Sequence, residues 1–149
     1  MKIKEVIFHL SNVYNGKPWY GKSIRKILSD AHDPDRKMVK IAAHMLAWRE
    51  YVLRKVQGED YTLEINSQND WPEATDLTMA KALKEIEETN EILAGLLSTK
   101  KDEWLRKKVA GTSYNFQFLL EGIIQHDIYH LGQIAILQRI KDSVPPANT

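Results

Sequence analysis

Residues 123–134 read Ile-Ile-Gln-His-Asp-Ile-Tyr-His-Leu-Gly-Gln-Ile, and the spacing of the apolar side chains in this stretch decides the fold. Apolar residues recur there every three or four positions, which is the period of a helix with one buried face. The pattern continues in both directions and predicts a helix over residues 115–141. His126 and His130 fall on its apolar face, so the sequence predicts two histidines in the interior of a helical protein.

The separation of His126 and His130 by four residues is suited to holding a metal ion. Side chains at positions i and i+4 of a helix leave the same face with Cβ atoms about 5–6 Å apart, so two imidazoles can share one divalent cation. Five histidines in 149 residues produce such a pair by chance in roughly one sequence in ten. The alternative is a pair of core histidines, each with its own hydrogen-bond partner. The local pattern leaves both interpretations open.

The rest of the chain repeats the helical period in long segments, whereas strand signals are sparse. We therefore predict an all-α protein, a four-helix bundle with long connecting loops. The long helices are expected at residues 3–14, 35–57, 75–98 and 115–141, and a short extra helix at residues 22–28.

The connections between these helices differ in how clearly they can be interpreted. Residues 59–74 form a polar loop that we expect to be a lid or a pocket edge, and a short strand could form at residues 61–65. Residues 100–111 carry no pattern that assigns them. No linker divides the chain, so residues 1–149 are predicted to form a single domain whose proline-containing tail frays.

The composition restricts the partners and the compartment. The chain is 43% hydrophobic and 28% charged, and 21 basic residues against 20 acidic ones give a formal charge of +1. Such a balance provides no field that would attract nucleic acid or an anionic membrane. No apolar run has the length of a membrane span, and the charged start of the chain is not typical of a signal peptide, so we expect a cytoplasmic protein. The absence of cysteine excludes disulfides, thiolate ligands and a cysteine nucleophile.

A third metal ligand is expected on a neighbouring helix, because catalytic zinc-type sites use three protein ligands and keep one position open. His44 is the candidate, since it replaces an apolar residue on the buried face of the second long helix, between Ile41 and Trp48. Three inward histidines from two helices can bind one face of an ion and leave the other face to water or substrate. For His44 alone, a hydrogen bond to a backbone carbonyl is the competing interpretation.

Three other site types do not fit the sequence. Zincin metalloproteases need His-Glu-x-x-His and a third ligand downstream, but this chain has Asp127 in place of the glutamate and no histidine beyond His130. The paired Glu-x-x-His elements of di-iron bundles are missing. No serine has the Gly-x-Ser-x-Gly context of a nucleophile elbow.

Three segments of the chain resemble the DinB-like superfamily of metalloenzymes, which includes the YfiT-like proteins and the bacillithiol S-transferases. They are residues 123–134, the run Trp-Tyr-Gly-Lys-Ser-Ile at 19–24, and residues 41–50 around His44. The resemblance extends over nearly the whole chain. It implies a DinB-like four-helix bundle, often a homodimer, in which the matching histidines bind one divalent metal ion. Those ligands would be His44, His126 and His130, with zinc or nickel as the expected ion and iron as a further option.

The resemblance also implies a reaction. In characterised relatives a low-molecular-weight thiol binds the metal, loses its proton and attacks an electrophile, so we expect a thiol S-transferase with a small-molecule substrate. A chain without cysteine is compatible with that chemistry. The open coordination position leaves two alternatives, a hydrolase that uses metal-bound hydroxide and a noncatalytic bundle in which the ion only joins two helices.

Several residues are candidates for supporting roles. Trp48 lies one turn after His44, and Trp19 lies in the loop after the first helix, so both could wall an apolar pocket. Gln133 lies one turn after His130 and could bond a bound water or substrate. Core packing is the competing interpretation for each of these residues. Glu50 and Glu121 are the candidate carboxylates for orienting the imidazoles.

The last predicted helix has a second apolar stripe besides the one with the histidines. Either this helix is central in the bundle, or its outer face meets another subunit. We expect a homodimer, because two-fold dimers are the commonest oligomers. The second stripe comprises Leu120, Ile124, Ile128, Leu131 and Ala135.

Overall fold

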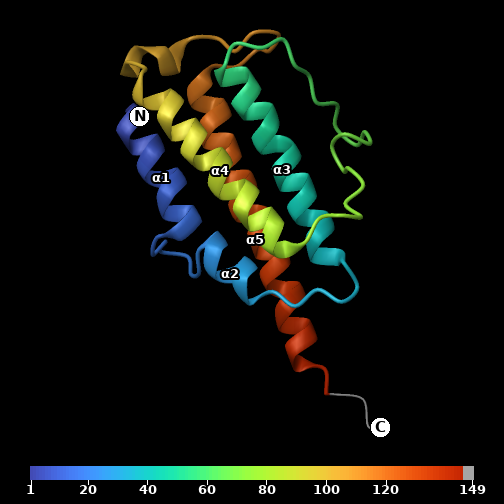
Figure 1. Cartoon of the computed structure of the whole chain (residues 1–149). Coiled ribbons are helices and arrows are strands. Elements are labelled where there is room, and N and C mark those ends of the chain that lie inside the picture. The colour runs from blue at the N-terminus through green and yellow to red at the C-terminus, as the bar shows by residue number, and fades with distance from the viewer. Residues whose placement is uncertain (146–149) are drawn as a thin grey trace.

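The structure is a computed structural model that describes residues 1–145, and every regular element in that range is helical (Figure 1). The predicted all-α class is therefore confirmed. The predicted fraying concerns a tail that lies mostly outside the described residues. The helices are α1 (Ile3–Asn15), α2 (Ile24–Asp30), α3 (Lys37–Val56), α4 (Met79–Ser98), the short 3-10 helix η1 (Asp102–Arg106) and α5 (Phe116–Ser143).

The four long helices form a bundle in which α1 and α5 run in one direction and α3 and α4 run in the other (Figure 1). Helix α3 packs against α4 and α5, and α1 packs against the same two helices. Helix α2 closes one end of the bundle by contacting α1, α4 and α5. Because α3 and α4 are parallel neighbours, the chain must return the full length of the bundle between them. Residues 57–78 make this crossover along the outside of the bundle.

Polar side chains fix where the helices begin. Ser23, Thr78 and Asn115 each accept a hydrogen bond from a backbone N–H in the first turn of α2, α4 and α5. The α3 helix is capped from the preceding turn, because the carboxylate of Asp33 accepts the N–H groups of the second and third residues of the helix. These caps place the starts of α2 and α3 two residues later than the periodicity predicts.

Two sequence-based expectations about the connections are wrong. Helix α4 begins at Met79 instead of residue 75, because Thr78 caps it and Arg36 holds the preceding carbonyl groups of Ala74 and Leu77. Residues 61–65 form no strand. Between α4 and α5 the structure adds η1 and an isolated bridge that pairs Lys108 with Asn115.

The interior of the bundle consists of two apolar clusters with a polar layer between them. One cluster contains Leu93 and Leu120, and the other, at the end closed by α2, contains Ile86 and Leu131. Buried polar residues occupy the levels between these clusters on three helices. They are His44 and Arg49 on α3, Asn90 on α4, and Asp127 and His130 on α5.

Helix α5 is central in the bundle. It contacts α1, α2, α3 and η1, and both Leu120 and Leu131 of its second apolar stripe are buried within the chain. That stripe is therefore explained without a second subunit. None of the helices among residues 1–145 combines the length and the apolar character that a membrane crossing requires.

Candidate metal centre

Three histidines from two helices meet in the polar layer. His44 comes from α3, and His126 and His130 come from consecutive turns of α5. One ring nitrogen from each of the three lies within 4.8 Å of the others. His44 and His130 are only 5% and 6% exposed, and His126 is partly buried. The structure thus brings together the three residues that the sequence selected, on adjacent antiparallel helices.

The ring nitrogens have the spacing and the chemistry that a divalent ion needs. The Nε2 atoms of His44 and His126 are 3.1 Å apart. Two nitrogens bound to one ion at about 2.0–2.1 Å would be separated by about 2.9–3.4 Å, depending on the coordination angle. Two nitrogen lone pairs this close repel each other unless a proton or a cation lies between them. The arrangement could therefore hold a metal ion with nitrogen ligands.

Asp70 orients His44 from the crossover loop. The Nδ1 atom of His44 lies 2.8 Å from the backbone oxygen of Asp70 and 2.9 Å from its Oδ1 atom. Both oxygens can only accept hydrogen bonds, so Nδ1 carries a proton, and in the neutral imidazole the lone pair is then on Nε2, which faces His126. The same carboxylate accepts the indole N–H of Trp48 and the backbone N–H of Asn66, at 2.7 Å each. Asp70 therefore sets the tautomer of His44.

Gln133 has the same role for His130. Its Oε1 atom lies 2.7 Å from Nδ1 of His130, and an amide oxygen can only accept, so Nε2 of His130 keeps its lone pair. The Nδ1 atom of His126 is buried and has no hydrogen-bond partner among the described residues.

Burial favours the neutral form of the two histidines on α5. Burial, together with the neighbouring rings of His130 and His44, lowers the pKa of His126 from 6.5 to about 3. Burial also lowers the pKa of His130. Although burial alone would raise the pKa of Asp70, the hydrogen bonds from Asn66 and Trp48 and the charge of a protonated His44 lower it. At neutral pH His126 and His130 are therefore unprotonated beside the ionised carboxylate of Asp70, as metal binding requires of histidine ligands.

Comparison with known families agrees with this arrangement. The sequence model described as the DinB superfamily matches residues 32–134, which include all three histidines. The chain belongs to the DinB superfamily. No match was found among curated proteins or among solved structures.

In the same polar layer as the histidines, this DinB chain has a buried ion pair that joins α3 to α5. The Arg49 guanidinium donates to Oδ2 of Asp127 at 2.6 Å and to Oδ1 of Asn90 on α4 at 2.7 Å. Burial raises the pKa of Asp127, and the positive charge of Arg49 opposes that shift. Asp127 thus connects helices and does not point toward the three imidazoles.

Sequence reasoning missed two residues of the crossover loop that touch the centre. Asp70 is one of them, and Trp71 is the other: its ring stacks on His44 with the centroids 3.9 Å apart and the planes 6° apart. The candidate carboxylates from the sequence bond elsewhere, since Glu50 pairs with Arg54 and Glu121 accepts from Gln117. The loop predicted at residues 59–74 does lie at the edge of the site, since two of its residues contact His44. The Asn-Asp-Trp-Pro run at residues 69–72 is the sequence feature that could have drawn attention to them.

The two tryptophans proposed as pocket walls have different environments. Trp48 is partly buried and lines a cavity together with His126. Trp19 is fully exposed, so it does not wall a pocket in this chain, which corrects the expectation for that residue.

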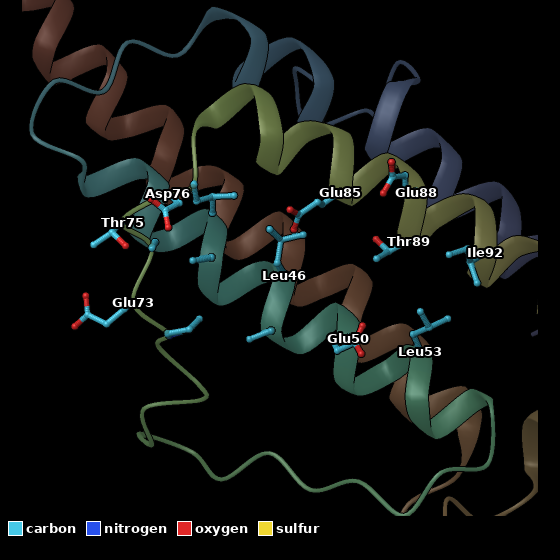
Figure 2. A pocket seen from close by; sticks show the side chains of 15 residues that line it. Leu46, Glu50, Leu53, Glu73, Thr75, Asp76, Glu85, Glu88, Thr89 and Ile92 are labelled. Carbon is cyan, nitrogen blue, oxygen red and sulfur yellow. The ribbon is translucent and has the colours of Figure 1, made fainter.

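A second depression lies between α3, α4 and residues 72–77, and none of the three histidines lines it. Figure 2 shows Glu50 on α3 and Glu85 and Glu88 on α4 around this groove of about 550 Å³. Its lining contains five carboxylates and no histidine, lysine or arginine. Two of the carboxylates are engaged in ion pairs on the surface, Glu50 with Arg54 and Glu88 with Lys84. The histidine cluster is therefore the stronger candidate for the functional site.

Proposed function

We propose that this DinB chain is a metal-dependent enzyme that activates a low-molecular-weight thiol for transfer to an electrophile. Its single divalent ion, expected to be zinc or nickel with iron as a further option, would be held by His44, His126 and His130. The observation that supports this proposal is the convergence of three histidine ring nitrogens from α3 and α5. Two of the rings are oriented by Asp70 and Gln133, as metal-binding histidines usually are.

The proposed reaction is a nucleophilic substitution in which the thiol loses one proton and its sulfur bonds to the electrophile. When bound, the ion supplies a Lewis acid that lowers the pKa of a coordinating thiol. In the proposed transfer the thiol sulfur would bond to the electrophilic atom, the leaving group would depart with the electron pair of the broken bond, and the thiol proton would pass to solvent. His44, His126 and His130 would position the sulfur, and Trp71 would shield one side of the centre from water.

The thiol part of the proposal rests on the resemblance to the bacillithiol S-transferases. A chain without cysteine fits it, because no internal thiol competes for the open position. Two alternatives use the same three histidines. One is a metal-dependent hydrolase, and the other is a noncatalytic bundle in which the ion links α3 to α5 and contributes folding energy.

The metal site is tested by elemental analysis of protein purified without a histidine tag. We expect one equivalent of a divalent transition metal in the wild-type chain and its loss in His44→Ala. The matched control is His9→Ala, because His9 is exposed on α1 and its removal should leave the metal content unchanged. Equal metal content in His44→Ala and the wild type would refute the proposed ligand set.

The reaction class is tested by assaying the metal-loaded chain on an electrophilic probe with and without candidate thiols. Turnover that requires the thiol supports the S-transferase, and turnover without it supports the hydrolase. No turnover, combined with a large fall in melting temperature on chelation, supports the structural role.

We also propose that the chain forms a homodimer through the exposed face of α5. Tyr129, Ile136 and Ile140 are spaced by seven and four residues, so they share one side of the helix, and each is more than half exposed. A second copy would remove this apolar stripe from water. Sedimentation should show a dimer for the wild type and a monomer for Ile136→Lys.

The cytoplasmic location stays a prediction.

A further inference from the structure

A cavity of about 230 Å³ lies between the second half of α3 and the first half of α5, directly beside the histidine cluster. Trp48 and Tyr51 of α3 form one wall, and Phe118, Gly122 and His126 of α5 form the other. Tyr114, just before α5, also contributes to the lining.

The lining of this cavity carries no charged side chain. Four of its residues are aromatic, and the other members besides His126 are aliphatic residues and one glycine. The hydroxyl groups of Tyr51 and Tyr114 bond each other at 2.9 Å, which leaves one phenolic proton of the pair free to donate. Burial raises the pKa of Tyr51, so this phenol stays neutral. Such a surface favours an uncharged ligand, because an ion would find no compensating group there.

The cavity and the histidine cluster share His126, and a second lining residue contacts the cluster through Asp70. His126 forms part of the cavity wall, and its Nε2 atom is 3.1 Å from Nε2 of His44. Trp48 lines the same cavity and donates its indole N–H to Asp70, the residue that orients His44. A molecule in the cavity therefore lies against the residues that define the metal position.

The size of the cavity matches one aromatic ring with a small substituent. An apolar cavity of about 150 Å³ is enough to bind benzene in an engineered protein. At Gly122 a Cβ atom would meet nothing within 4 Å, so the backbone of α5 leaves open space at this point. Glycine within a helix is less favourable than alanine, and here it preserves room beside His126.

We infer that this cavity binds an uncharged, single-ring aromatic part of the substrate and places it beside the histidine cluster. The inference rests on the proposed function and narrows it, because it names the electrophile as a neutral aromatic compound. Edge and face contacts with Trp48, Tyr51 and Phe118 would hold the ring. The free phenolic proton of the tyrosine pair would bond a polar substituent.

The test follows binding of 4-fluorobenzyl alcohol to the full chain by fluorine NMR, both as purified and after chelation. We expect saturable binding in both states. In the chelated sample, 4-fluorobenzoate should bind at least tenfold more weakly, because its charge would be buried without a partner. Nuclear Overhauser contacts from the alcohol should reach the rings of Tyr51 and Phe118.

A variant that fills the cavity gives the sharper result. Gly122→Leu should weaken probe binding at least tenfold, whereas Gly95→Leu should leave binding unchanged, because Gly95 is an exposed residue of α4 where a Cβ atom likewise meets nothing within 4 Å. Circular dichroism checks that both variants fold, and Gly122→Ala provides a smaller change if the leucine variant does not. The inference would be overturned if a folded Gly122→Leu bound the alcohol probe as tightly as the wild type. It would also be overturned if the probe in the wild type contacted rings other than those of Tyr51 and Phe118.

These readouts need no turnover, so they separate this inference from the proposed function. A chain that transfers thiols but does not bind the probe would refute the cavity ligand alone. A chain that binds the probe at Tyr51 and Phe118 but holds no metal would support the cavity ligand and refute the metal-dependent reaction.

Discussion

Asp70 shows how one loop residue can determine the state of a buried imidazole. Its carboxylate and its backbone oxygen both accept from Nδ1 of His44, and the carboxylate is itself held by Trp48 and Asn66. This arrangement fixes which nitrogen of His44 has the lone pair. The affinity of the cluster for an ion should therefore depend on a residue that does not touch the ion.

We predict that Asp70→Asn weakens metal affinity by about 10–100-fold without unfolding the chain, because the outer partner of a ligand histidine tunes both its orientation and its basicity. The measurement is a competitive titration against a chromophoric chelator. Asp60→Asn is the matched control, since Asp60 is an exposed acid in the same crossover loop. Equal affinities in the two variants would show that Asp70 has no such role.

At this scale the sequence could predict the three clustered histidines but not the loop residues beside them. His126 and His130 are found by helical spacing, and His44 is found because it interrupts an apolar face. Asp70 and Trp71 lie in a loop that has no periodicity, so nothing in the pattern places them beside α3. Their contact with His44 depends on the path of the crossover, which is a tertiary property.

At the scale of the elements, the polar layer joins three helices through one buried ion pair. Arg49 of α3 bonds Asp127 of α5 and Asn90 of α4, and the pair is almost completely buried. Removing one partner leaves an uncompensated charge in the interior, whereas removing both leaves an apolar contact.

We predict that Arg49→Met and Asp127→Leu each lower the free energy of unfolding by about 3–5 kcal/mol, and that the double variant loses less than either single one. Urea denaturation of chelated protein measures both effects. The exposed pair Lys84–Glu88 is the control, because Lys84→Ala should change stability by no more than about 0.5 kcal/mol. Additive losses in the double variant would contradict this account.

The elements themselves were largely predictable, because each long helix has an apolar face with the period of 3.6 residues. The errors are at the ends of helices. Helix α4 starts four residues later than its pattern suggests, since Thr78 provides the cap and Arg36 binds the carbonyl groups before it. Capping by Arg36 joins residues far apart in the sequence and depends on packing, so it cannot be found from local spacing.

For the whole molecule, the buried histidines link stability to pH. The pKa of His126 is about 3 in the folded chain, against 6.5 for an ordinary histidine, and the pKa of His130 is also lowered. Between these values the unfolded chain binds more protons than the folded chain does. The free energy of unfolding is therefore highest above about pH 6.5 and falls as the pH decreases toward 3.

We predict that the melting temperature of the chelated chain falls from pH 7 to pH 5, a range above most carboxyl titrations. The melting temperature of His126→Gln should fall less, because this variant lacks the histidine whose pKa is shifted further. Differential scanning calorimetry of both proteins provides the comparison. Identical slopes for the two proteins would exclude His126 as a source of the pH dependence.

The crossover between the parallel helices α3 and α4 also has a kinetic consequence. Asp70 and Trp71 hold this strap of chain onto His44, so loosening of the strap would remove the partner of Nδ1 and uncover one side of the cluster. Exchange of an ion through that side would then follow a backbone motion, while exchange past His126 would follow access through the cavity.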